Sequence, residues 1–271
     1  MKIIVSHDVD HLFWSEHLLK DLYITKLWLR SFKLLLTGVI DAKTFAARIN
    51  FWTDKRINRL DELMEYESLM NIPATYFFVM RKGFGVSYSV EKAKPFIKEI
   101  LGKGFNVGVH GMSYKDPEAM KKEFESFKNI SGLDSFGVRM HYLRNDPDTI
   151  KYLSRTGYSF DSTDYKIEAP YPVNKMIEFP IAVMDAYAVR PAHKKIDIAK
   201  AYTLERLALA EKNNVPYFTI NFHDLVFNPA YSLYKDWFTW LIEHCIHKNY
   251  HFINFENAIK EQHENKTNDG R

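Results

Sequence analysis

Short apolar runs alternate along the chain with longer segments in which apolar residues recur every three or four positions. The short runs are typical of β-strands and the longer segments of amphipathic helices. The predicted strands span residues 2–6, 74–79, 105–109, 135–140, 158–161, 176–179, 216–222 and 250–253. The predicted helices span residues 16–36, 42–70, 90–101, 117–128, 147–155, 198–211, 231–247 and 255–264. This order of elements predicts βα units around a parallel sheet.

Several predicted strands are almost entirely apolar, such as Ala-Thr-Tyr-Phe-Phe-Val at 74–79. Such runs are expected when helices cover the outside of a parallel sheet. Seven or eight βα units predict a closed or nearly closed barrel, which normally forms one domain of about 250 residues. We therefore expect a single domain over residues 1–263. The polar segment 264–271 is predicted to be a disordered tail.

The segment 12–52 adds two predicted helices after the first strand. Its first helix combines apolar residues with basic ones, among them Lys20, Lys26, Arg30 and Lys33. A basic amphipathic helix can lie on a membrane surface. The alternative is a lid or an extra helical layer on the barrel.

The net charge, the cysteine content and the targeting signals limit the partners and the location that we expect. The formal net charge is only +3, so nothing indicates nucleic-acid binding. Cys245 is the single cysteine and cannot form an internal disulfide. The start of the chain lacks the apolar run of a secretory signal, and no segment is apolar enough for a membrane span. We expect a cytoplasmic protein, which membrane contact would place at the inner face of the membrane.

The end of the first strand carries the densest chemistry, in the run Ser-His-Asp-Val-Asp-His at 6–11. Side chains alternate along a strand, so Asp8 and Asp10 point to the same side. Two carboxylates this close repel each other unless a positive group lies beside them. A divalent metal ion or an arginine would supply that charge.

Three later strands also end in histidine or arginine residues that could take part in catalysis or metal binding. His110 follows Gly-Val, Arg139 and His141 alternate onto one side, and His223 follows Asn-Phe. The carboxyl ends of barrel strands surround one cavity, so these groups are expected to converge with the two aspartates. Such a set is typical of a metal-assisted active site.

The order of these groups resembles the polysaccharide deacetylase superfamily, the NodB-homology fold of carbohydrate esterases, in a divergent His-Asp-Val-Asp subgroup. The resemblance rests on Asp-x-Asp, the His after Val-Gly-Val, Arg-x-His-Tyr and a late Phe-His-Asp, and it covers most of residues 2–253. It implies a distorted (β/α)7 TIM-like barrel with a helical insert at 12–52. It also implies hydrolysis of N- or O-acyl groups on sugars with Zn²⁺ or another divalent metal such as Co²⁺, Mn²⁺ or Ni²⁺.

The resemblance assigns roles to individual residues. It implies that Asp8 is the general base and Arg139 its ion-pair partner. Asp10 and His110 are implied to be metal ligands, and His223 the general acid.

A further aspartate usually adjusts the general acid in this superfamily. Asp161, Asp164 and Asp185 all compete for that role here, and Asp161 ranks first.

One position departs from the superfamily, which has a second metal-binding histidine four residues after the first. Tyr114 stands there, and a phenol is a poor zinc ligand compared with imidazole. Either His141 supplies the third ligand, or His7 or His11 does, or the metal site is degraded.

The sequence thus predicts a metal-dependent deacetylase or deformylase acting on a sugar precursor of surface polysaccharide or lipopolysaccharide. The expected substrate is an acylated sugar, such as a nucleotide sugar or a lipid-linked saccharide. The rival is a metal-free sugar-binding or regulatory protein on the same barrel. No phosphate-binding loop and no Gly-x-Ser-x-Gly elbow occurs, which disfavours a nucleotide kinase and a serine hydrolase. The sequence does not predict the oligomeric state.

Overall fold

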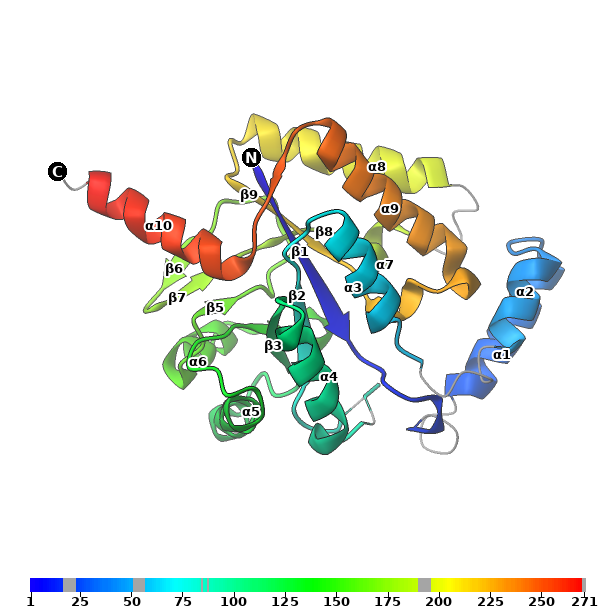
Figure 1. The fold of residues 1–271 in the computed structure, drawn as a ribbon, viewed down its shortest axis with the longest axis horizontal. Coiled ribbons are helices and arrows are strands. Elements are labelled where there is room, and N and C mark those ends of the chain that lie inside the picture. Colours follow the sequence, from blue (N-terminus) through cyan, green and yellow to red (C-terminus); the bar gives the residue numbers. More distant parts are fainter. Residues whose placement is uncertain (17–22, 51–56, 84, 87, 190–195, 270–271) are drawn as a thin grey trace.

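The computed structural model describes residues 1–16, 23–50, 57–83, 85–86, 88–189 and 196–269. They form a mixed α/β fold around one curled sheet (Figure 1). The central strands are β1 (Lys2–Val9), β2 (Thr75–Val79), β3 (Asn106–Gly111), β4 (Val138–Met140) and β9 (Tyr217–Asn221). All pairs among them are parallel, as the alternation of strands and helices predicted.

The sheet curls into a half-barrel rather than a fully closed ring. Its strand order is β6-β7-β5-β4-β3-β2-β1-β9-β8, and β10 (His251–Phe252) pairs with the start of β1. One side of the sheet ends in β5 (Phe160–Asp161), β7 (Met176–Glu178) and β6 (Tyr171–Val173), and the other ends in β8 (Ile181–Met184). The apolar pattern did not reveal β6, which pairs antiparallel with β7, or β8. The expected (β/α)7 barrel is therefore present as a curled, incompletely paired sheet.

Alternation along the strands separates the interior of the barrel from its helical cover. In β1, Ile3, Val5 and Val9 belong to the outer apolar core, whereas Ile4 belongs to an inner cluster. Ser6 and Asp8 continue the inner side and both contact Arg139. The period of two residues thus gives β1 an apolar inner residue at Ile4 and polar inner residues at Ser6 and Asp8, toward its carboxyl end.

Helices cover the outer face of the sheet, and one closes its amino-terminal end. The covering helices are α3 (Leu60–Leu69), α4 (Val90–Gly102), α5 (Pro117–Ser131), α6 (Thr149–Thr156), α8 (Ile196–Lys212) and α9 (Ser232–His247). α10 (Phe255–Asp269) stacks Phe255 on Phe160 inside the inner cluster. The short α7 (Asp185–Ala188) follows β8 at the carboxyl end of the sheet.

The segment after β1 contains η1 (Trp14–Glu16), α1 (Tyr23–Leu36) and α2 (Ala42–Ile49). The predicted helix 42–70 is therefore interrupted at residues 57–59, and the described part of the predicted helix 16–36 is α-helical from Tyr23 to Leu36. Ile57 donates its backbone N–H to Leu12, and the Asn58 side-chain amide donates to the same carbonyl. These tertiary contacts hold the chain outside a helix before α3 begins. Lys20 and the apolar residues 18, 19 and 22 lie outside the described residues.

The carboxyl-terminal helix is longer than expected. α10 continues to Asp269, although residues 264–271 were predicted to be a disordered tail. Among the described helices, none has the length and apolar character needed to cross a bilayer.

Candidate metal centre and active site

The interior of the barrel is layered along the strands. Ile4, Phe77 and Phe160 form an apolar floor with Phe255 from α10. The Arg139 guanidinium lies above it, with its central carbon 4.5 Å from the centroid of the Phe77 ring. The polar residues that the sequence singled out follow toward the carboxyl ends of the strands.

Asp8 is buried and held by two partners. Arg139 Nη1 donates to Asp8 Oδ1 at 3.0 Å, and Asn221 Nδ2 donates to Asp8 Oδ2 at 2.7 Å. Burial opposes ionisation, but the charges of His110, Arg139 and His223 lower the pKa of Asp8 to about 2. Asp8 is therefore an ionised carboxylate at neutral pH, beside its expected arginine.

Asp10, His110 and His141 form a compact cluster at the mouth of the barrel. Asp10 Oδ1 lies 3.3 Å from His110 Nε2 and 3.2 Å from His141 Nδ1, and the two ring nitrogens are 3.0 Å apart. Asp10 Oδ1 is buried and has no hydrogen bond of good geometry within the described residues. These three residues form a group with one potential ligand atom each, all within 4.8 Å of one another.

The backbone of β4 and of the turn after it constrains the two imidazoles. His110 Nδ1 faces the Arg139 carbonyl oxygen at 2.9 Å. A carbonyl can only accept, so His110 carries a proton on Nδ1, and Nε2 is the ring nitrogen that faces Asp10. His141 begins the turn η3 (His141–Leu143), where Tyr142 and Leu143 have φ values of 58° and 50°. Left-handed backbone at two consecutive non-glycine residues is strained, and such strain occurs at functional sites.

His223 approaches both aspartates from β9. Its Nε2 lies 3.9 Å from Asp8 Oδ2 and 3.8 Å from Asp10 Oδ2. On the other side of the ring, Nδ1 lies 2.8 Å from Asp185 Oδ1. Burial opposes protonation, but the charge and hydrogen bond of Asp185, with the charges of Asp10 and Asp8, raise the pKa of His223 to about 10. In this arrangement His223 is protonated at neutral pH.

Asp185 takes the position that the sequence analysis ranked for Asp161. Asp185 also accepts the backbone N–H of His223 at 2.8 Å, so it fixes both the ring and the strand end. Asp161 lies on β5, where it accepts from Thr163 Oγ1. Burial raises its pKa to about 6, and the nearby Glu178 shares the same buried pocket. Asp185, and not the first-ranked Asp161, is therefore the carboxylate that the structure places against His223.

The alternative third ligands lie elsewhere. His7 points to the opposite face of β1, where Nε2 meets Glu67 Oε1 at 2.5 Å. His11 is not part of the cluster of potential ligands that the described residues form. Tyr114 lies under the Arg144 guanidinium, 5.2 Å from the ring centroid. His141 is therefore the residue that the structure brings to Asp10 and His110.

Asn221 is a site residue that the sequence analysis missed. It donates to Asp8 and accepts from Arg139 Nη1 at 2.8 Å. A signal was present, because Asn221 precedes His223 by two residues and so faces the same side of β9. An amide in an otherwise apolar strand, in phase with a catalytic candidate, indicates a buried polar contact.

Solved structures of other proteins are similar to this fold. A protein from Mycobacterium smegmatis described as a polysaccharide deacetylase matches with a TM-score of 0.63 at 16% identity, covering 98% of this chain and 91% of that one. A Streptococcus mutans CE4 esterase matches with a TM-score of 0.52 at 12% identity, covering 93% and 85%. A CE4 family pseudoenzyme from Bacillus anthracis matches with a TM-score of 0.50 at 11% identity, covering 95% and 65%.

The sequence itself finds no relative: neither a family model nor a curated protein matches it. The similarity to solved structures therefore establishes a shared fold. This chain has the fold of the polysaccharide deacetylases, as its resemblance to that superfamily predicted.

Proposed function

We propose that this chain, built on the polysaccharide deacetylase fold, is a metal-dependent hydrolase that removes an N- or O-acyl group from a sugar. One observation carries the proposal. The Asp10–His110–His141 cluster lies within reach of two differently charged groups, the Asp8 carboxylate and the His223 imidazole. A base, an acid and a set of metal ligands close to one another are the parts that acyl hydrolysis needs.

The donor set fits a divalent cation. Asp10 Oδ1 is buried without a good hydrogen bond, and two imidazole nitrogens face it at 3.2 and 3.3 Å. One carboxylate and two imidazoles are a common ligand set of catalytic zinc. When bound there, the ion would polarise the acyl oxygen and lower the pKa of water. Zn²⁺ is the metal we expect, with Co²⁺, Mn²⁺ or Ni²⁺ as substitutes.

Two residues beside the cluster could carry out the two proton transfers. Asp8 remains ionised at neutral pH because Arg139 and Asn221 hold it, so it can accept a proton from the attacking water. His223 is protonated and oriented by Asp185, so it can donate a proton to the departing amine or alcohol. Nearby carboxylates raise the pKa of the acid, and a nearby arginine lowers that of the base.

We infer the substrate class from the fold and not from the residues of the site. Solved proteins of this fold are described as polysaccharide deacetylases and as a CE4 esterase, which supports an acetylated or formylated sugar. We favour a precursor of surface polysaccharide, either a nucleotide sugar or a lipid-linked saccharide.

Metal content and acetate release test this proposal together. Purified wild type should hold about one divalent ion per chain by elemental analysis and should release acetate from N- or O-acetylated oligosaccharides. Asp10→Ala should lose the metal and the activity. Asp134→Ala, whose carboxylate is on the surface, should keep both.

A second variant separates binding from chemistry. Asp8→Asn should keep the metal but slow acetate release by about 10²–10⁴-fold, since a positioned general base contributes that much. Wild type that holds no metal but binds acetylated sugars would favour the sugar-binding alternative. Wild type with neither property would overturn both functions.

A further inference from the structure

Helix α1 has a buried inner face and an exposed apolar outer face. Leu27 and Ser31 are buried, and Leu27 packs against Ile57 and Leu225. They lie one helical turn apart and form the inner face, which holds α1 against the barrel. Leu225 follows His223 by two residues, so this contact lies next to the candidate active site.

The opposite face of α1 is apolar but exposed to solvent. Trp28 is 39% exposed, Phe32 54% and Leu36 71%, and the three follow one another at intervals of four residues. Leu29, 68% exposed, lies on the same side of the helix. We call these four residues the outer stripe. A contiguous stripe of large apolar side chains on a surface marks an interaction site.

Positive charge borders the outer stripe. Lys26, Arg30 and Lys33 follow one edge of α1, and the helix has no acidic residue. Residues 23–49 carry a net charge of +4, whereas the whole chain carries only +3. The positive charge of the protein is therefore concentrated in the layer that exposes the outer stripe.

We propose that α1 docks this protein on an anionic lipid surface, with the outer stripe among the acyl chains and its cationic edge among the headgroups. Aromatic and leucine side chains with flanking lysine and arginine are what such a surface recognises. The inference concerns where the protein sits and does not depend on the proposed hydrolysis. In Figure 1, α1 and α2 stand at one side of the molecule, beyond the arrowhead of β1.

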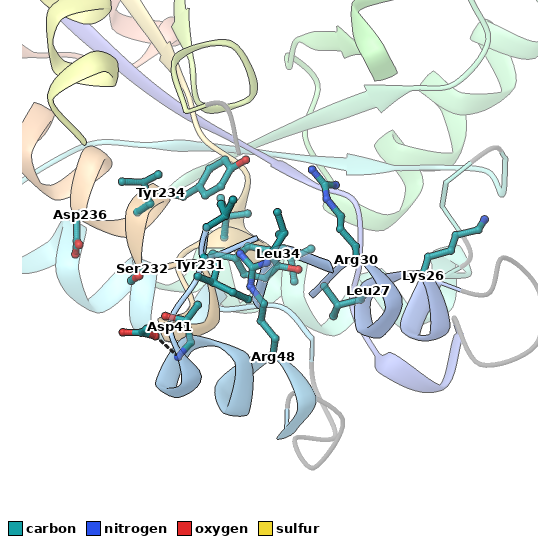
Figure 2. Close-up of a pocket in the computed structure, with 17 residues that line it drawn as sticks. Lys26, Leu27, Arg30, Leu34, Asp41, Arg48, Tyr231, Ser232, Tyr234 and Asp236 are labelled. Carbon is teal, nitrogen blue, oxygen red and sulfur yellow. Dashed lines mark hydrogen bonds between the residues drawn. The ribbon is translucent and has the colours of Figure 1, made fainter. Parts of the chain in front are cut away.

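The cationic edge of α1 also borders a cavity of about 780 Å³ between this layer and the start of α9. Figure 2 shows Arg30 and Arg48 at this cavity together with Tyr231 and Tyr234. Asp41 and Asp236 line it as well, and Asp41 Oδ1 accepts the backbone N–H of Thr44 as the helix cap.

Co-sedimentation of the full-length chain with vesicles tests the proposal. Wild type should pellet with vesicles of phosphatidylcholine containing phosphatidylglycerol, and much less with phosphatidylcholine alone. The triple variant Trp28→Ser, Phe32→Ser, Leu36→Ser should lower the partition coefficient about ten-fold or more, because it removes the apolar side chains that insert. Lys33→Gln should lower it about five-fold, and only on anionic vesicles.

A control variant and a folding check show whether a loss of vesicle binding comes from the outer stripe. Leu69→Ser removes a side chain that is 74% exposed on α3 and should bind vesicles like wild type. Equal thermal unfolding of the triple variant and wild type would show that the variant is folded. Wild type that pellets with neither vesicle, or a folded triple variant that pellets like wild type, would overturn the proposal. So would a wild-type dimer in light scattering that the triple variant turns into a monomer without a change in vesicle binding, since the outer stripe would then join two copies.

Discussion

Arg139 is fully buried yet completely hydrogen-bonded. Its five N–H groups donate to the Ser162 carbonyl, Asp8, Asn221 and the hydroxyls of Ser6 and Ser162. Five donors in a planar fork are what a guanidinium offers, so no proton is left without a partner. The network joins β1, β4, β9 and the residue after β5 around the candidate general base.

Arg139→Lys should strongly destabilise the protein. An ammonium group has three donors and a different shape, so several buried acceptors would lose their partner, and breaking such a buried pair costs about 3–5 kcal/mol. Urea unfolding at neutral pH measures the change in the free energy of unfolding. Arg155→Lys, on the exposed surface of α6, should change it by less than about 0.5 kcal/mol. A loss below 1 kcal/mol for Arg139→Lys would contradict this view of the network.

Asp185 should control the protonation of His223, whereas Asp161 should not. In metal-free protein, Asp185→Asn should lower the pKa of His223 by more than one unit, because the variant removes the nearest negative charge and a charged hydrogen bond. Asp161→Asn should leave it unchanged. An NMR titration of the imidazole nitrogens follows this pKa directly, and the reverse ranking of the two variants would restore Asp161 to the role.

Strand periodicity made much of the site predictable from the sequence. Asp8 with Asp10, and Arg139 with His141, were expected to share a side because they are two residues apart on one strand. Asp185 could not be ranked in this way, because it follows β8, a strand that the apolar pattern did not reveal. Its approach to His223 depends on the pairing of β8 with β9.

At the scale of elements, the loop after β3 is held by a buried carboxyl group. Glu123 on α5 accepts the backbone N–H groups of Met112 and Ser113 and the Ser113 hydroxyl. Burial raises the pKa of Glu123 to about 7, although these donors and Arg81 oppose the rise. Glu123 therefore links α5 to the end of the strand that carries His110.

Glu123 should make the folded protein less stable as the pH rises from about 4.5 to 7. In this window the unfolded chain loses the proton while the folded protein keeps it, so stability falls, by about 3 kcal/mol for a shift of this size. Above the folded pKa the loss is complete. In Glu123→Gln this component disappears, so the variant should gain on wild type across the window in urea unfolding. Glu125→Gln, exposed on the same helix, should follow wild type at every pH; a parallel course for Glu123→Gln would contradict the shift.

Element boundaries were predictable where local pattern and tertiary packing agree. α5 follows its pattern closely, with Asp116 as cap, Pro117 at its start and Gly132 with a positive φ at its end. The predicted helix 42–70 failed because its apolar residues continue in phase while Ile57 turns inward to pack on Leu27 and Leu225. A contact between segments so far apart in the sequence leaves no local signal.

At the scale of the whole molecule, buried apolar side chains are unevenly distributed between the barrel and the helices α1 and α2. The barrel buries large aromatic and aliphatic side chains on both faces of its sheet. The layer of α1 and α2 attaches through few buried side chains: α2 has none, and α1 contributes Leu27 and Ser31 among those the structure describes. Segments with little buried apolar surface open at a lower free energy than the core.

Hydrogen exchange should therefore show two levels of amide protection in the molecule. Amides of α2 should exchange with an opening free energy of at most a few kcal/mol, whereas amides of β1 and β9 should exchange only through global unfolding. Mass spectrometry of exchanged peptides measures both, and adding denaturant should speed exchange in the strands far more than in α2. If α1 docks on anionic lipid, such vesicles should slow its exchange and leave β9 unchanged. Equal protection of α2 and β9 in the free protein would show instead that this layer is an integral part of the core.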